Sequence, residues 1–182
     1  LDGMVFTPST GFNGSARLQI DVSDQGNSGT GGALTASQSL MIEVTPVNDP
    51  PAVSFVSGNS DYPESAGPVI VAPFGTISDV DSANFDGGRM VVYFSNNGQP
   101  EDRIAIRNEG VGAGQISVNG SSVVFGGMVI GDWVGGTDGS TPLIISFNSN
   151  ATPAIVQALT RNITYENVSD APSTAVRTMA GY

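Results

Sequence analysis

The sequence predicts an all-β protein, an antiparallel sandwich or barrel that carries one short helix. The first observation is alternation: in residues 16–23 every even-numbered position is apolar and every odd-numbered position is polar, which is the period of a half-buried strand. The second is the distribution of turn-forming residues: 24 Gly, 11 Pro and many Asn and Asp residues divide the chain into short segments. Many short strands separated by turn residues are typical of antiparallel β-sandwiches and barrels.

The other strands follow from the same pattern. Leu40, Ile42 and Val44 repeat the alternation and predict a second strand. The dipeptide Asn119-Gly120 predicts a hairpin between two strands, because both residues tolerate positive φ. Further strands are predicted at residues 90–95, 103–107, 115–118, 123–125, 128–130, 143–147 and 163–165.

One stretch has helical character. Thr152 suits the N-cap and Pro153 suits the first helical position. Ile155, Val156 and Leu159 would then share one face of the helix. We therefore expect one short helix near residues 153–162, covering an end or an edge of the sheets.

A proline-rich link over residues 46–51 is the clearest boundary in the chain. Consecutive prolines cannot donate to a strand ladder and favour an extended, fairly stiff path. Residues 1–45 carry too few strands for an independent sandwich, so we expect them to be the C-terminal strands of a preceding unit. Residues 52–182 carry most of the next sandwich. The chain begins with Leu1, and we expect it to be a piece of a longer protein.

The amino-acid composition excludes several classes of function. The chain has six Arg, no Lys, no His and no Cys against seventeen acids, for a net charge of −11. These absences exclude the Ser-His-Asp triad, thiol nucleophiles, disulfides and thiolate zinc sites. Strong acidity disfavours nucleic acids, which require a basic surface, and no apolar run reaches the roughly 18 residues of a membrane helix. We expect no enzyme activity, nucleic-acid partner or membrane insertion; a hard cation, a carbohydrate or another protein remains as partner.

Calcium is the cation that these acids favour, because it takes six to eight oxygen ligands from carboxylates, carbonyls and water. Asp79 and Asp81 stand at alternate positions, so a loop can turn both carboxylates inward. They do not begin an EF-hand, since Ala83 occupies the place of the third ligand. The alternative is that these aspartates only form turns, a role that Asp and Asn often have.

Several short motifs follow one another along the chain: Gly11-Phe12-Asn13-Gly14, Val47-Asn48-Asp49-Pro50-Pro51, Ile77-Ser78-Asp79-Val80-Asp81, Glu101-Asp102-Arg103 and Asn162-Ile163-Thr164-Tyr165-Glu166-Asn167. In this order they resemble the tandem cadherin-like repeats of large bacterial surface adhesins and RTX-type exoproteins. The resemblance implies immunoglobulin-like β-sandwiches strung end to end, with calcium at the joints. It also implies an extracellular or cell-surface location and neighbouring repeats of the same chain as partners.

The resemblance further implies which residues hold the metal. In such joints the ligands come from the link, from an early Glu and from an Asp-x-Asp loop. Pro46 and Pro50 stand where animal cadherins have two more ligands, so we expect one calcium ion. Asp102 is a further candidate, although a turn-forming role is the favoured interpretation there. The expected ligands are Asn48, Asp49, Glu64, Asp79 and Asp81.

Repeats of this kind close with two strands after the Thr-Tyr-Glu-Asn segment. We therefore expect residues 52–182 to lack their last strands, unless residues 1–45 of this or a neighbouring molecule supply them by strand addition. The alternative is an arbitrary boundary with ragged ends.

Together these observations predict a non-enzymatic, calcium-stiffened spacer of a bacterial extracellular adhesin that supports cell adhesion. The alternative function is a carbohydrate-binding module, with Trp133 and the adjacent loops as the ligand surface. Packing of Trp133 over a neighbouring glycine is the favoured interpretation of that residue. A catalytic domain ranks third.

Overall fold

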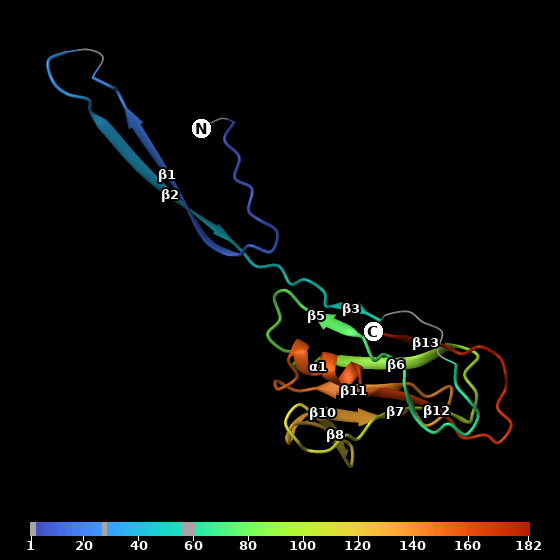
Figure 1. Cartoon of the computed structure of the whole chain (residues 1–182). Coiled ribbons are helices and arrows are strands. Elements are labelled where there is room, and N and C mark those ends of the chain that lie inside the picture. Colours follow the sequence, from blue (N-terminus) through green and yellow to red (C-terminus); the bar gives the residue numbers. More distant parts are fainter. Residues whose placement is uncertain (1–2, 27–28, 56–60) are drawn as a thin grey trace. The chain divides into compact units, whose positions relative to one another are not determined.

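The computed structural model of the chain describes residues 3–26, 29–55 and 61–182. The chain divides into two compact units, Leu1–Asp49 and Pro50–Tyr182, and each is described by itself (Figure 1). Its regular structure is mostly antiparallel strand with one short helix, so the prediction of an all-β, sandwich-like fold is confirmed. No helix in the described ranges is long and apolar enough to cross a membrane.

The first unit contains one long β-ribbon. β1 (Gly14–Ser23) and β2 (Thr35–Val44) pair antiparallel, with Leu18 opposite Leu40. Leu18, Ile20, Leu40 and Ile42 lie on one face, and the other face is mostly polar, although it also carries Met41 opposite Arg17. None of the buried hydrophobic side chains of the described chain belongs to this unit. A two-stranded ribbon without a packed face is at best marginally stable in water.

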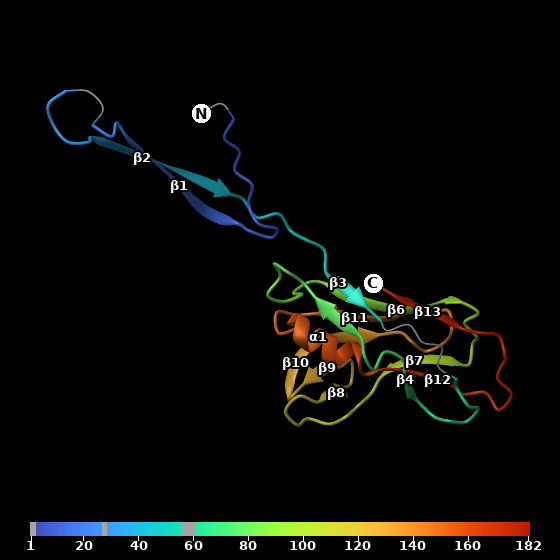
Figure 2. The same ribbon diagram turned by 45° about the horizontal axis from the view of Figure 1, so that its top comes forward.

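The second unit contains the other strands and the helix. Its strands are β3 (Ala52–Ser54), β4 (Val69–Ile70), β5 (Thr76–Ser78), β6 (Arg89–Asn96), β7 (Asp102–Ile106), β8 (Ile116–Asn119), β9 (Ser122–Phe125), β10 (Met128–Val134), β11 (Leu143–Phe147), β12 (Ile163–Asn167) and β13 (Thr178–Gly181), and its helix is α1 (Pro153–Thr160). The largest sheet has the order β13-β6-β11-β10-β9-β8, a second has the order β4-β12-β7, and β3 pairs with β5 (Figure 2).

The core of this unit is aliphatic. β6 to β12 contribute inward-facing Ile, Leu and Val side chains at every second position, as the sequence pattern predicts. Ile116, Ile130, Leu143 and Ile145 are fully buried. The Asn119-Gly120 hairpin is also confirmed, because Gly120 turns between β8 and β9 with φ of 60°.

The helix begins where the sequence predicts and ends two residues earlier. Thr152 Oγ1 accepts the N–H of Ile155 at 3.4 Å and caps the helix. Val156 and Leu159 are buried, and the Gln157 side chain accepts the backbone N–H of Ile77 on β5. The helix therefore covers the β5 side of the core.

Truncation of the core should destabilise the protein sharply. Ile145→Ala removes a fully buried side chain and should lower the free energy of unfolding by about 2–5 kcal/mol, because a cavity remains. Urea unfolding followed by the fluorescence of Trp133 measures this change. Val111→Ala is the control, since Val111 is 73% exposed; equal losses in both variants would contradict this account of the core.

Candidate functional site

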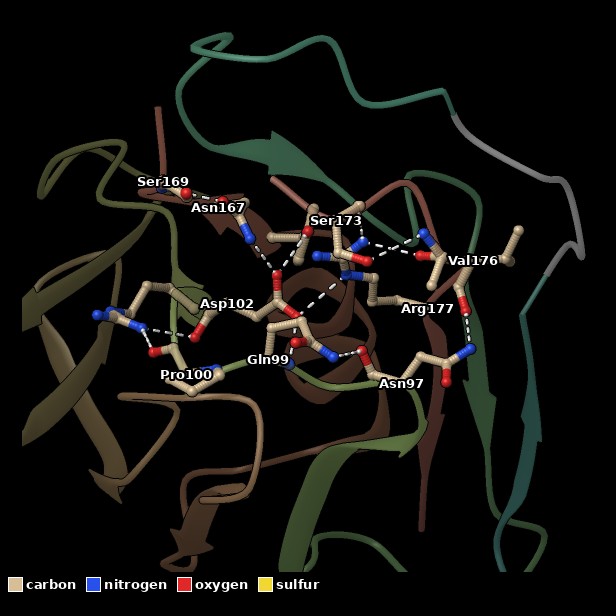
Figure 3. A network of polar contacts seen from close by, with 12 residues as sticks. Asn97, Gln99, Pro100, Asp102, Asn167, Ser169, Ser173, Val176 and Arg177 are labelled. Atoms are coloured by element: carbon tan, nitrogen blue, oxygen red, sulfur yellow. Dashed lines mark hydrogen bonds and ion pairs between the residues drawn. The ribbon is translucent and has the colours of Figure 1, made fainter. Parts of the chain in front are cut away.

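The most connected polar cluster of the described chain surrounds Asp102, the first residue of β7 (Figure 3). Its side chain is fully buried although it carries a carboxylate. A tight turn places it there: the Asp102 N–H donates to the carbonyl of Gln99 at 3.0 Å, and the Gln99 N–H donates to Asp102 Oδ2 at 2.8 Å. The turn between β6 and β7 is thus closed around the carboxylate itself.

Two residues of β12 satisfy the other oxygen. Tyr165 donates its hydroxyl to Asp102 Oδ1 at 2.8 Å, and Asn167 donates its amide to the same atom at 2.6 Å. Asn167 stands directly opposite Asp102 in the β7–β12 register, and Tyr165 lies two residues further along. Because side chains two apart on a strand share a face, both donors reach one acceptor.

Arg177 completes the cluster from a segment far away in sequence. Its Nε lies 3.2 Å from Asp102 Oδ2, an ion pair in which the arginine side chain is 12% exposed. Its Nη1 donates to the carbonyls of Ser173 and Ala175. Residues 168–177, here called the strap, thus wrap around their own arginine before they enter β13. Arg177 Nη2 is buried and has no hydrogen-bond partner among the described residues.

The protonation states of this cluster are fixed near neutral pH. Burial by itself raises the pKa of Asp102, but the hydrogen bonds from Asn167, Gln99, Tyr165 and Arg177 outweigh burial and hold that pKa below its ordinary value. Burial and the adjacent Asp102 carboxylate raise the pKa of Tyr165 to about 12. General acid–base catalysis works best with a pKa near the operating pH, and the pKa values of Asp102 and Tyr165 are shifted away from neutrality. The hydrogen bonds of this cluster connect β7, β12 and the strap.

The predicted calcium ligands lie in several places. Asp79 and Asp81 share the loop after β5, where Asp79 Oδ1 accepts the N–H groups of Asp81 at 3.1 Å and Ser82 at 2.9 Å. These hydrogen bonds, that of Ser82 foremost, hold the pKa of Asp79 below its ordinary value. The loop therefore has the aspartate turn that the sequence offered as the alternative.

The other predicted ligands belong to separate parts of the chain. Asn48 and Asp49 belong to the first unit, where the Asn48 amide donates to the Asp49 carbonyl. Glu64 is exposed in the second unit. Asp102 lies in its own cluster, where both carboxylate oxygens accept protein hydrogen bonds. Within residues 3–26, 29–55 and 61–182, no three acidic side chains converge as a metal-holding group, and calcium stays a prediction.

Trp133 lies on β10 and is partly buried. Its ring packs against the hydrophobic core, and its Nε1 donates to the Gly120 carbonyl at 3.2 Å. Across the sheet it stands opposite Ile145. The indole thus has a packing role, and its role in binding a carbohydrate remains a prediction.

Sequence reasoning did not find Tyr165, Asn167 or Arg177 as partners of Asp102. One signal was present: Tyr165 and Asn167 stand two apart in a strand pattern, so both side chains point to the same face. Nothing in the sequence connects that face to Arg177. Comparison with known proteins adds no family, because no family model matches the chain and no solved structure resembles it significantly.

Loss of the buried charge should destabilise the second unit. Asp102→Asn leaves Arg177 without its anion and should lower the free energy of unfolding at neutral pH by about 3 kcal/mol. Denaturant unfolding measures this change. Asp170→Asn on the exposed strap is the matched control, and an Asp102→Asn protein as stable as this control would contradict the structural role of the ion pair.

The same carboxylate should make stability depend on acid. Its pKa is lower in the folded than in the unfolded protein, so its stabilisation is fully present above the ordinary value of 3.8 and disappears as the pH falls through the folded pKa. The melting temperature of the wild type should therefore fall faster between about pH 4 and pH 2 than that of Asp102→Asn. Parallel acid profiles would contradict this assignment.

Proposed function

We propose that this chain is a non-enzymatic structural spacer of a bacterial extracellular adhesin, with calcium bound beside the link between its two units. The observation that carries the proposal is the Asp102 cluster, because it ties β7, β12 and the strap together with charge-assisted hydrogen bonds. Such bonds are stronger than neutral ones. A module that resists extension benefits from cross-links of this kind between segments distant in sequence.

The distribution of charge supports a role for a divalent cation. The chain has seventeen acidic residues and six arginines, and one of those arginines forms an ion pair with Asp102 in the core. The chain has no lysine, and a divalent ion offsets the repulsion between carboxylates that lie close together.

The loop of Asp79 and Asp81 suits such an ion in its chemistry. Asp79 and Asp81 stand two residues apart in a turn in which Asp79 Oδ1 accepts the N–H groups of Asp81 and Ser82. Carboxylate oxygens are hard ligands that calcium prefers, and backbone carbonyls and water complete its shell in other proteins. Asn48, Asp49 and Glu64 are the further residues that would contribute. We expect an affinity of order 10⁻⁴–10⁻³ M, as for other extracellular modules.

Calcium should raise the thermal stability of the chain. At about ten times the dissociation constant, the added free energy of unfolding is about 1.4 kcal/mol, or about 3 °C in melting temperature for a protein of this size. Differential scanning calorimetry in millimolar calcium and in EDTA measures this shift. Asp79→Asn together with Asp81→Asn should abolish it, whereas Asp132→Asn in β10 should not. Identical melts of the wild type with and without calcium would refute the calcium proposal.

A further inference from the structure

The link between the two units contains the one Asp-Pro dipeptide of the sequence. Asp49 is followed by Pro50, whereas each of the other aspartates is followed by a residue with a backbone N–H. Residues 45–51 lie outside the strands and are exposed. The peptide bond from Asp49 to Pro50 is also the boundary between the two compact units. A break in this bond would therefore cut neither a strand nor the helix.

An aspartate side chain can react with the backbone beside it in two ways. In the first, the N–H of the next residue attacks the side-chain carboxyl group, and the chain stays intact as a cyclic imide. Proline has no backbone N–H, so this reaction is closed at Asp49. In the second, a side-chain oxygen attacks the carbonyl carbon of the same residue and closes a five-membered ring. Both reacting groups of Asp49 are then held close together by the covalent structure itself.

Asn48 adds a hydrogen bond to the carbonyl that would react. Its side-chain amide donates to the carbonyl oxygen of Asp49 at 3.3 Å. This oxygen gains negative charge when the carboxylate attacks, and a donor already placed at such an oxygen stabilises the transition state. The nucleophile, the carbonyl and the donor to its oxygen therefore all belong to two consecutive residues.

We propose that the chain cleaves itself at the bond from Asp49 to Pro50, with the Asp49 carboxylate as the nucleophile and the Asn48 amide as the donor to the oxyanion. A bond forms between the carboxylate oxygen and the Asp49 carbonyl carbon, and the bond from that carbon to the Pro50 nitrogen breaks. The nitrogen takes a proton from the solution and leaves as a secondary amine. Water then opens the cyclic anhydride, and Asp49 ends with two carboxyl groups. The balance is the addition of one water molecule.

The two products correspond to the two units of the fold. Residues 1–49 keep β1 and β2, and residues 50–182 keep every buried hydrophobic side chain of the described chain. The Asp102 cluster also lies entirely within residues 50–182. Cleavage therefore removes the covalent connection between the ribbon and a unit that keeps its core. This activity goes beyond the proposed spacer role and requires no calcium.

The test is incubation of the full chain in mildly acidic buffer with EDTA, because the acid supplies the proton that the leaving nitrogen takes. Mass spectrometry should detect the complementary fragments 1–49 and 50–182, and N-terminal sequencing of the second should read Pro50-Pro51-Ala52. Circular dichroism checks that the chain stays folded. EDTA removes calcium, so the result is separate from the calcium proposal. A wild type that stays as intact as Asp49→Asn would overturn the self-cleavage.

Substitutions in the link assign the two roles. Asp49→Asn removes the carboxylate and should abolish cleavage, and Asp49→Glu should slow it at least about tenfold, because a six-membered ring places the reacting atoms less well. Asn48→Ala should slow cleavage about two- to tenfold, the effect of one hydrogen bond. Val47→Ala is the matched control, because Val47 adjoins Asn48 and is 79% exposed; it should cleave like the wild type. Wild-type rates in Asp49→Asn would overturn the proposal, and a wild-type rate in Asn48→Ala would overturn the role of Asn48.

Isotope labelling gives the sharpest result. In water enriched in heavy oxygen, opening of the anhydride places the label in either carboxyl group of Asp49, whereas direct hydrolysis of the peptide bond labels only the α-carboxyl group. Tandem mass spectrometry of the C-terminal peptide of the first fragment locates the label. We expect part of it in the Asp49 side chain. A label confined to the α-carboxyl group would overturn the attack by the side chain.

Discussion

A carboxylate enclosed in a β-sheet core retains its charge only when protein donors replace the water that it has lost. Asp102 meets this requirement with donors from the preceding turn, from β12 and from Arg177. These donors come from three different segments. One buried charge therefore fixes the register of β7 against β12 and directs the path of the strap, and a change in any of these segments would leave a buried charge unsatisfied.

Arginine suits this position because its guanidinium offers several donors in one plane. Nε binds Asp102, while Nη1 binds the carbonyls of Ser173 and Ala175. Arg177 thus connects the core to the strap, and the next residue begins β13, the border strand of the largest sheet. The ion pair that stabilises the interior therefore also holds the beginning of this border strand.

The two units differ in how much hydrophobic burial offsets the conformational entropy that the chain loses on folding. The second unit buries aliphatic side chains from three sheets and a helix, and the hydrophobic effect stabilises it. The first unit has the same alternating pattern but none of the buried hydrophobic side chains of the described chain. Its ribbon has no packed layer of described residues on the face that carries Leu18 and Leu40.

The sequence determined the strands whose two faces have different surroundings. β1, β2 and β6 to β12 contain the segments that the sequence predicted as strands, and α1 has an N-cap and a proline at its start. β3, β4 and β5 were not predicted, because two or three residues are too few to display a period. Their positions depend on pairing with strands elsewhere in the chain.

In the candidate site, too, the sequence determined some features and the tertiary structure decided others, but for a different reason. The sequence alone identified an acidic chain without His, Cys or Lys, and hence the chemistry open to it. Only the tertiary structure placed Arg177 beside Asp102 across 75 residues and left Val53 uncovered opposite a buried Ile77. Local patterns report which face of a strand a side chain occupies, whereas the identity of its neighbours depends on how distant strands pair and pack.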